Sequence, residues 1–189
     1  MKEIEILVEV YEEEKVVLDK LKKFNFIGDK LTVDTYFYDP LRPNLKPNNT
    51  MQLSECLRLR TVKDKSLIAY KVDKFDNKGV WLYSDEYETK VESPNTLFQI
   101  FEKMGLKELI VIKNLKRIYK SENYEIAFEK VDDLGLFLEV EFCTDEDVDI
   151  VSLKHQIQKF IDELGLKVSK ECKMGKPEMM LRKKQMYIQ

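Results

Sequence analysis

The sequence is poor in the residues on which many enzymes and secreted proteins depend. It contains one histidine, His155, in a segment with helical periodicity, which argues against a histidine nucleophile or a histidine zinc site. Its three cysteines are far apart and form no Cys-x-x-Cys pair, which argues against a disulfide framework and a structural zinc site. Reduced thiols of this kind are typical of a cytoplasmic protein.

Long apolar runs and an excess of one charge are also missing. No apolar stretch approaches the roughly 20 residues that span a bilayer, and acidic residues stand where a signal peptide would be apolar. The 35 acidic and 32 basic residues give a net charge of −3, which argues against a protein that coats DNA or an anionic membrane. We therefore expect a cytoplasmic protein without a nucleic-acid or membrane partner.

The composition instead suits one compact domain. The 189 residues are 43% hydrophobic and 11% aromatic, which is enough for a real core, and 35% are charged. Periodicity predicts strands joined mainly by antiparallel hairpins over residues 1–142, with helices among them, and further helices over 147–188. The sequence therefore predicts a single α+β domain over residues 1–189 whose sheet is large enough to curl.

Most of the predicted strands have one apolar and one charged face. The first strand alternates Ile and Val with Glu3 and Glu5, and LRLR at 57–60 alternates leucine with arginine. The charges come in pairs of like sign, as in EYE at 86–88 and EVE at 139–141. Such pairs are unfavourable unless an opposite charge lies nearby. A sheet that faces solvent is the simplest alternative, but a solvated face normally mixes the two signs along each strand.

Closure of the curled sheet would turn these charged faces toward one axis and create a polar tunnel. Converging Arg and Lys side chains bind phosphate oxygens through charge-assisted hydrogen bonds, whereas paired carboxylates bind hard divalent cations. Together, the two sets of residues predict a site for a metal-bound polyphosphate.

The same residues resemble the CYTH superfamily, the triphosphate tunnel metalloenzymes, which include class IV adenylate cyclases, thiamine triphosphatases and inorganic tripolyphosphatases. The resemblance rests on the N-terminal Glu-x-Glu, LRLR, AYK at 69–71, EYE and LGLFLEVE at 134–141, in the family's order and spacing. It implies a closed, eight-stranded antiparallel β tunnel barrel with flanking helices. It also implies that Mg²⁺ or Mn²⁺ is used to process a triphosphate-containing small molecule.

The resemblance further implies roles for individual side chains. Catalytic carboxylates on the metal side are implied at Glu3, Glu5 and Glu129. Metal ligands are implied at Glu86, Glu88, Glu139 and Glu141. Phosphate-binding bases are implied at Arg58, Arg60 and Lys71, and on the basic strand 111–119 at Lys113 and Arg117. The register of that strand stays open, because Lys116 lies on its other face.

Three departures from the family pattern leave the activity open. Leu7 stands where the N-terminal motif commonly has a lysine that helps to activate the attacking group. Ser84 stands where an arginine is usual, and MGKPEMM at 174–180 replaces a common Ser-Tyr pair. We expect hydrolysis of the terminal phosphate of thiamine triphosphate, tripolyphosphate or a nucleoside triphosphate. The alternatives are a class IV adenylate cyclase and a tunnel that binds polyphosphate or nucleotide without catalysis, and a homodimer is compatible with each.

Overall fold

A computed structural model describes residues 2–63, 65–77 and 81–184. The strands are β1 (Lys2–Glu9), β2 (Asn25–Tyr38), β3 (Glu55–Val62), β4 (Lys65–Phe75), β5 (Trp81–Val91), β6 (Lys107–Lys120), β7 (Glu125–Val131) and β8 (Gly135–Thr144). The helices are α1 (Glu14–Leu21), the short 3₁₀ helix η1 (Pro43–Leu45), α2 (Pro94–Lys103), α3 (Ile150–Glu163) and α4 (Lys176–Lys184). The predicted hairpin turn at 77–79 and the end of the predicted C-terminal helix fall largely outside the described residues.

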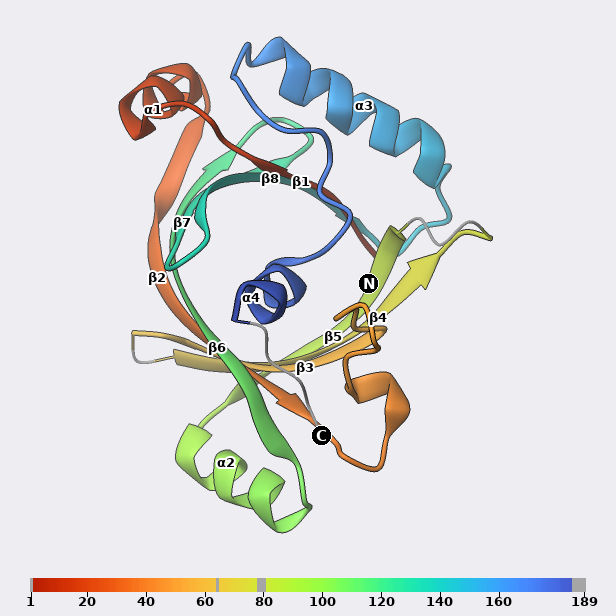
Figure 1. Ribbon diagram of the computed structural model, residues 1–189. Helices are drawn as coiled ribbons and strands as arrows, with labels where there is room; N and C mark the ends of the chain where they lie inside the picture. Colours follow the sequence, from red (N-terminus) through yellow and green to blue (C-terminus); the bar gives the residue numbers. More distant parts are fainter. Residues whose placement is uncertain (1, 64, 78–80, 185–189) are drawn as a thin grey trace.

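The strands close into a barrel in the order β1-β5-β4-β3-β2-β6-β7-β8, and each neighbouring pair is antiparallel (Figure 1). Because side chains alternate along a strand, every strand presents one face to the barrel interior and one to the outside. The predicted α+β fold with a closed, eight-stranded antiparallel barrel is therefore confirmed.

The main hydrophobic core lies outside the barrel, between its wall and the helices. Ile4, Ile6 and Val8 of β1 are fully buried together with Ile157 and Ile161 of α3, which lies across β1 and β8 (Figure 1). A second apolar cluster packs α2 against β2 and β3. Burial of apolar surface stabilises the fold by roughly 25 cal/mol per Å². Since this apolar packing is on the outer face, the inner face is left for charged side chains.

The last helix, α4, lies at one open end of the barrel, and its first residues line the cavity (Figure 1). Met180 and Leu181 of α4 are buried in an apolar cluster with Leu7, Tyr36 and Phe137. Leu7 and Tyr36 belong to the inward faces of β1 and β2. An apolar patch inside the barrel therefore receives the apolar side of the helix.

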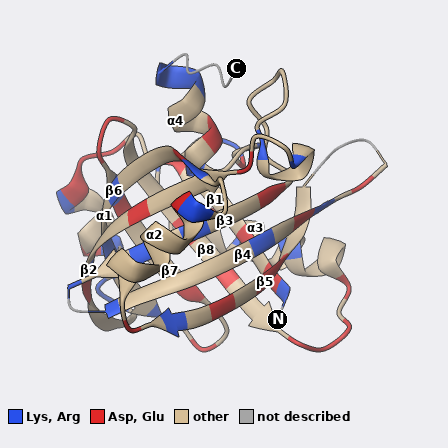
Figure 2. Ribbon diagram, turned by 90° about the horizontal axis from the view of Figure 1, so that it is seen from below, with Lys and Arg blue, Asp and Glu red and all other residues tan. Residues whose placement is uncertain are grey.

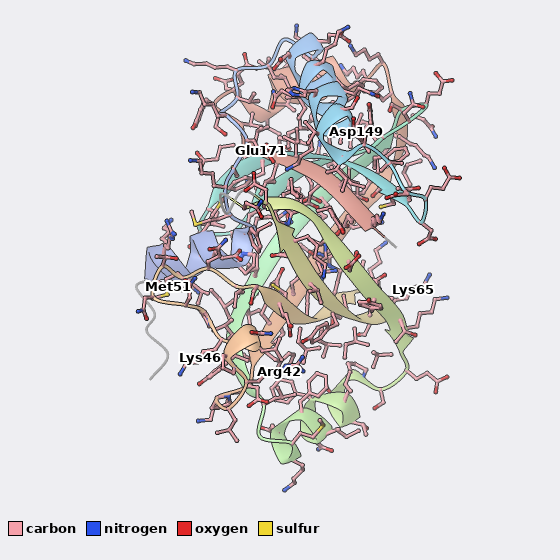
Figure 3. All side chains as sticks on the ribbon, turned by 90° about the vertical axis from the view of Figure 1, so that its right-hand side faces the viewer. Arg42, Lys46, Met51, Lys65, Asp149 and Glu171 are labelled. Carbon is pink, nitrogen blue, oxygen red and sulfur yellow. The ribbon has the colours of Figure 1, made fainter. Side chains whose placement is uncertain are left out.

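The two ends of the barrel differ as a result. Figure 3 shows α4 next to Met51 at one end and Lys65 at the opposite end. The guanidinium of Arg182 donates to the carbonyl of Thr50, which ties α4 to the segment before β3. We call the end at which α4 lies the helix end of the barrel, and the opposite end, at Lys65, the far end.

None of the described helices combines the length and the apolar character needed to cross a bilayer.

Candidate active-site tunnel

The inward faces of the strands enclose a cavity of about 620 Å³, and most of the residues that line it are polar or charged. Both signs of charge recur along the strands (Figure 2). A volume of this size is typical of a small-molecule site. The enclosed, charged tunnel expected from strand alternation is therefore present, and the alternative of an open sheet that faces solvent is wrong.

Strands β2 and β3 form the basic wall of the tunnel. Arg60 donates two hydrogen bonds of 2.7 Å to Asp34, which lies directly opposite it in the β2–β3 register. Arg58 is on the same face, with its Nη2 atom 3.2 Å from Glu86. Its Nε atom is buried and has no hydrogen-bond partner among the described residues. A fixed guanidinium with an unused donor is suited to a phosphate oxygen.

Lys71 of β4 connects the basic wall to the acidic one. Its ammonium group pairs with Glu3 of β1 and lies 3.7 Å from Glu86, its opposite neighbour on β5. Burial alone would raise the pKa of Glu3, but Lys71 lowers it below its ordinary value. Glu88 lies 3.6 Å from Arg58. Glu86 and Glu88, predicted as metal ligands, are thus paired with Lys71 and Arg58, and neither belongs to the groups of described acidic residues that could hold a metal ion.

The acidic wall has a pair of like charges at its centre. Glu5 of β1 and Glu141 of β8 lie directly opposite each other. In the described part of the chain, neither forms an ion pair with a Lys or Arg side chain. Burial and the carboxylates of Glu139 and Glu3 raise the pKa of Glu5 to about 8, and burial with the same neighbours raises the pKa of Glu141 well above its usual range. Two opposed carboxylates destabilise a sheet unless a cation neutralises them.

This arrangement fits a divalent metal ion. Carboxylate oxygens of Glu5, Glu139 and Glu141 lie within 4.8 Å of one another, and we call these three residues the metal group. Carboxylate oxygens are the ligands that Mg²⁺ and Mn²⁺ prefer. Glu3, Glu141 and Cys143 form another such cluster. A thiol is a softer ligand than Mg²⁺ or Mn²⁺ prefers, so the carboxylates of the metal group suit these ions better than the cluster with Cys143 does.

Next to the metal group, Glu129 and Glu139 are bridged by two lysines. The Nζ atom of Lys116 lies 2.7 Å from Glu129 and 3.4 Å from Glu139, and that of Lys176 on α4 lies 2.8 Å and 2.5 Å from them. Asn114 also donates a hydrogen bond to Glu129. Burial opposes ionisation of Glu139, but the two lysines hold its pKa well below the usual range. Glu139 therefore belongs both to the metal group and to this lysine-bridged pair.

On the basic strand β6, the face predicted to bind phosphate is the wrong one. Asn114 and Lys116 line the cavity, whereas Lys113 is exposed on the other face. Arg117 lies 3.2 Å from Glu14 of α1, outside the barrel. The prediction that Lys113 and Arg117 bind phosphate is therefore wrong, because strand alternation directs both away from the tunnel.

Several charged tunnel residues were not assigned a role from the sequence: Asp34, Lys116, Lys176 and Glu178. The inward position of Asp34 could have been predicted from the sequence, because Asp34 alternates with apolar Val33 along a strand whose successive side chains point to opposite faces. The positions of Lys176 and Glu178 could not have been predicted in this way, since only the docking of α4 brings them into the tunnel. Glu178 is buried, its Oε2 atom has no hydrogen-bond partner among the described residues, and burial raises its pKa to about 7.

Comparisons with known proteins agree with this geometry. The model of the CYTH domain matches residues 1–173. A Methanocaldococcus jannaschii protein named "Putative adenylate cyclase MJ0240" is 32% identical over 186 residues, which cover 96% of this chain and 99% of that protein. The solved PH1819 protein of Pyrococcus horikoshii has a TM-score of 0.78 at 24% identity, over 95% of this chain and 99% of its own. The Hippeastrum protein HpAC1, described with a dominant triphosphatase activity, has a TM-score of 0.64 at 15% identity, over 100% and 98%.

Proposed function

This chain belongs to the CYTH domain family, and from that premise we propose that it is a metal-dependent triphosphatase. The proposed reaction is hydrolysis of the terminal phosphate of thiamine triphosphate, tripolyphosphate or a nucleoside triphosphate. One observation carries the proposal: in the closed strand order, β3 with its two arginines and the neighbouring β2 lie across the barrel from β8 and β1 with the metal group. A triphosphate with a bound cation is the small molecule that such facing walls complement.

The basic wall holds the phosphate chain in this proposal. Arg58 offers its unused Nε donor, and Arg60 is kept in a fixed orientation by its two hydrogen bonds to Asp34. Lys71 adds a point charge between the two walls. Phosphoryl transfer depends mainly on placing the reacting groups in line and on neutralising developing charge, and rigid donors serve both needs.

The acidic wall holds the cation. Glu5, Glu139 and Glu141 would hold Mg²⁺ or Mn²⁺, which would supply charge neutralisation and an activated water. Glu3 is held by Lys71, and its carboxylate lies close to that of Glu141, where it would orient the attacking water. Glu129 has a different task from the one expected, because Asn114, Lys116 and Lys176 surround its carboxylate. It positions lysines and does not act as a free base.

A second candidate function is that of a class IV adenylate cyclase, which the name of the Methanocaldococcus jannaschii relative favours. The two reactions differ in the nucleophile: water attacks the terminal phosphate in one, and a ribose hydroxyl attacks the α-phosphate in the other. Both need the same phosphate clamp and cation. The cytoplasmic location and the homodimer stay predictions.

A phosphate-release assay on a substrate panel tests the proposal. Tripolyphosphate, thiamine triphosphate and ATP are each incubated with Mg²⁺ or Mn²⁺, and cyclic AMP and pyrophosphate are measured in parallel. We expect phosphate release from at least one substrate, and none in EDTA. Cyclic AMP formation without phosphate release would identify a cyclase instead. Tight binding of tripolyphosphate by calorimetry without any turnover would identify a non-catalytic binder.

The raised pKa of Glu5 predicts how the metal-free protein responds to pH. Its pKa is about 8 in the fold and 4.5 ordinarily, so between these values the folded protein binds more protons than the unfolded chain. The contribution of Glu5 to stability is therefore greatest below the ordinary pKa and is lost as the pH rises through the folded value. In EDTA we expect the melting temperature to fall by about 10 °C between about pH 5 and pH 9.

Scanning calorimetry at closely spaced pH values measures this slope. Glu5→Gln should flatten it, whereas Glu108→Gln, on an exposed residue of β6, should leave it unchanged. Saturating Mg²⁺ should stabilise the protein most at the alkaline end, because the cation binds the ionised carboxylates. A melting temperature that rises over this range in EDTA would contradict the assignment.

A further inference from the structure

Position 7 lies beside one of the metal-group carboxylates. In the β1–β8 register, Leu7 is directly opposite Glu139, and opposed residues of antiparallel strands have Cβ atoms about 5 Å apart. A lysine at this position would put an ammonium group next to Glu139, whereas Leu7 brings no charge. Leu7 is instead 5% exposed and packs in the same apolar cluster as Met180 and Leu181 of α4.

The helix that Leu7 helps to dock carries an ammonium group to the same carboxylate. Lys176 is the first residue of α4, and its Nζ atom lies 2.5 Å from Oε2 of Glu139 and 2.8 Å from Oε2 of Glu129. Its side chain is only 14% exposed. Position 7 of β1 thus brings no charge to Glu139, and α4, whose apolar side chains share a cluster with Leu7, brings an ammonium group to it.

The need to neutralise Glu129 does not by itself explain why Lys176 lies beside it. Lys116 stands directly opposite Glu129 in the β6–β7 register and already contacts both glutamates. Lys176 contacts the second oxygen of each, and its charge also acts on Glu5. An ammonium group this close to the metal group fixes the orientation of Glu139 and repels a cation bound there.

We propose that Lys176 is a positioning residue that replaces, from the C-terminal helix, the lysine that position 7 lacks. It orients Glu139 within the metal group and keeps the cation from binding too tightly for turnover. The C-terminal helix is thereby part of the active site. This inference rests on the proposed triphosphatase function, although its effect on cation binding can be measured without turnover.

Four variants test the proposal: Lys176→Met, Lys176→Arg, the double variant Leu7→Lys with Lys176→Met, and Lys184→Met as a control on an exposed residue of α4. Calorimetry and electron paramagnetic resonance measure Mn²⁺ binding, and steady-state assays measure kcat and KM. For Lys176→Met we expect Mn²⁺ affinity to rise about tenfold and kcat to fall about tenfold. Lys176→Arg should keep both near the wild-type values, and Lys184→Met should change neither.

The double variant separates positioning from a structural role. It restores an ammonium group beside Glu139 from β1, so both quantities should return toward wild type. A Lys176→Met variant with unchanged or weaker Mn²⁺ binding would overturn the proposal. If the protein hydrolyses no triphosphate, the proposed function fails, but the Mn²⁺ measurements still decide the role of Lys176. Melting temperatures in EDTA identify a variant that fails to fold, and Lys176→Arg then carries the test, with a loss of Mn²⁺ binding counting against it.

Discussion

Replacing Glu141 with glutamine is expected to lower triphosphate hydrolysis by about 100-fold or more while making the metal-free fold more stable. Glu141 faces Glu5 across the β1–β8 pair, and burial and neighbouring carboxylates already raise its pKa. A glutamine side chain keeps the shape, removes a carboxyl group whose ionisation this position disfavours, and can donate a hydrogen bond to Glu5. It also removes one carboxylate from the metal group, and with it the charge that binds the cation.

The opposite signs of the two effects make this variant informative. Steady-state kinetics with Mg²⁺ measures the loss of activity, and the melting temperature in EDTA measures the gain in stability. Glu108→Gln, an exposed residue on β6, is the matched control and should change neither quantity. If Glu141→Gln lost stability together with activity, the carboxylate would be a structural residue and not a cation ligand.

The barrel could be predicted because strand alternation is a local property of the sequence. Glu3 and Glu5 alternate with Ile4 and Ile6, and the structure buries the isoleucines outside the barrel while the glutamates line its cavity. A shift of one residue would exchange the two faces of the strand, so a pattern this regular fixes its orientation. The same argument holds for the arginines of β3, which alternate with buried leucines.

Strand β6 could not be oriented in this way because both of its faces carry bases. Lys116 reaches Glu129 in the tunnel, whereas Arg117 reaches Glu14 of α1 and Asp29 of β2 outside it. The choice between the two faces depends on which acidic residues lie beside each, and these come from distant parts of the chain. The sequence of the strand alone does not contain that information.

The ion pairs of the tunnel depend on strand order in the same way. Asp34 stands opposite Arg60, and Lys116 stands opposite Glu129, each across a different pair of strands. Glu5 stands opposite another carboxylate. Only the closed strand order shows which of the described tunnel charges are compensated by their neighbours, and that the Glu5–Glu141 pair is not. The proposed cation site is therefore a property of the register more than of any motif.

The surface on which α4 docks could not be predicted from the sequence. Its apolar side chains suited a helix that flanks the barrel, and the sequence does not say which surface a helix covers. The signal lay elsewhere, in apolar Leu7 on the charged face of β1. In the sequence, Leu7 stands where the family commonly has a lysine, and this departure left the activity open. In the structure it is a docking site for the helix that supplies Lys176.

Arg58→Met is expected to cause the largest loss of substrate binding, with kcat/KM lower by about 100-fold or more. Arg58 is buried, lies 3.2 Å from Glu86 and keeps its Nε donor free of protein partners in the described part of the chain. Methionine preserves much of the apolar packing of the side-chain stem while it removes the charge and all donors. Arg58→Lys should recover only part of the loss, because an ammonium group cannot reproduce bidentate contacts to phosphate.

Arg117→Met and Lys113→Met are the matched controls, since they remove the same charge from the outer face of β6. Both should hydrolyse tripolyphosphate within about twofold of the wild type, because a screened charge outside the barrel contributes little to a site inside it. Calorimetric titration with tripolyphosphate should show weakened binding for Arg58→Met alone. Equal losses in Arg117→Met and Arg58→Met would mean that the substrate binds outside the tunnel. The contrast therefore tests the assignment of faces on β3 and β6 as directly as it tests the phosphate clamp.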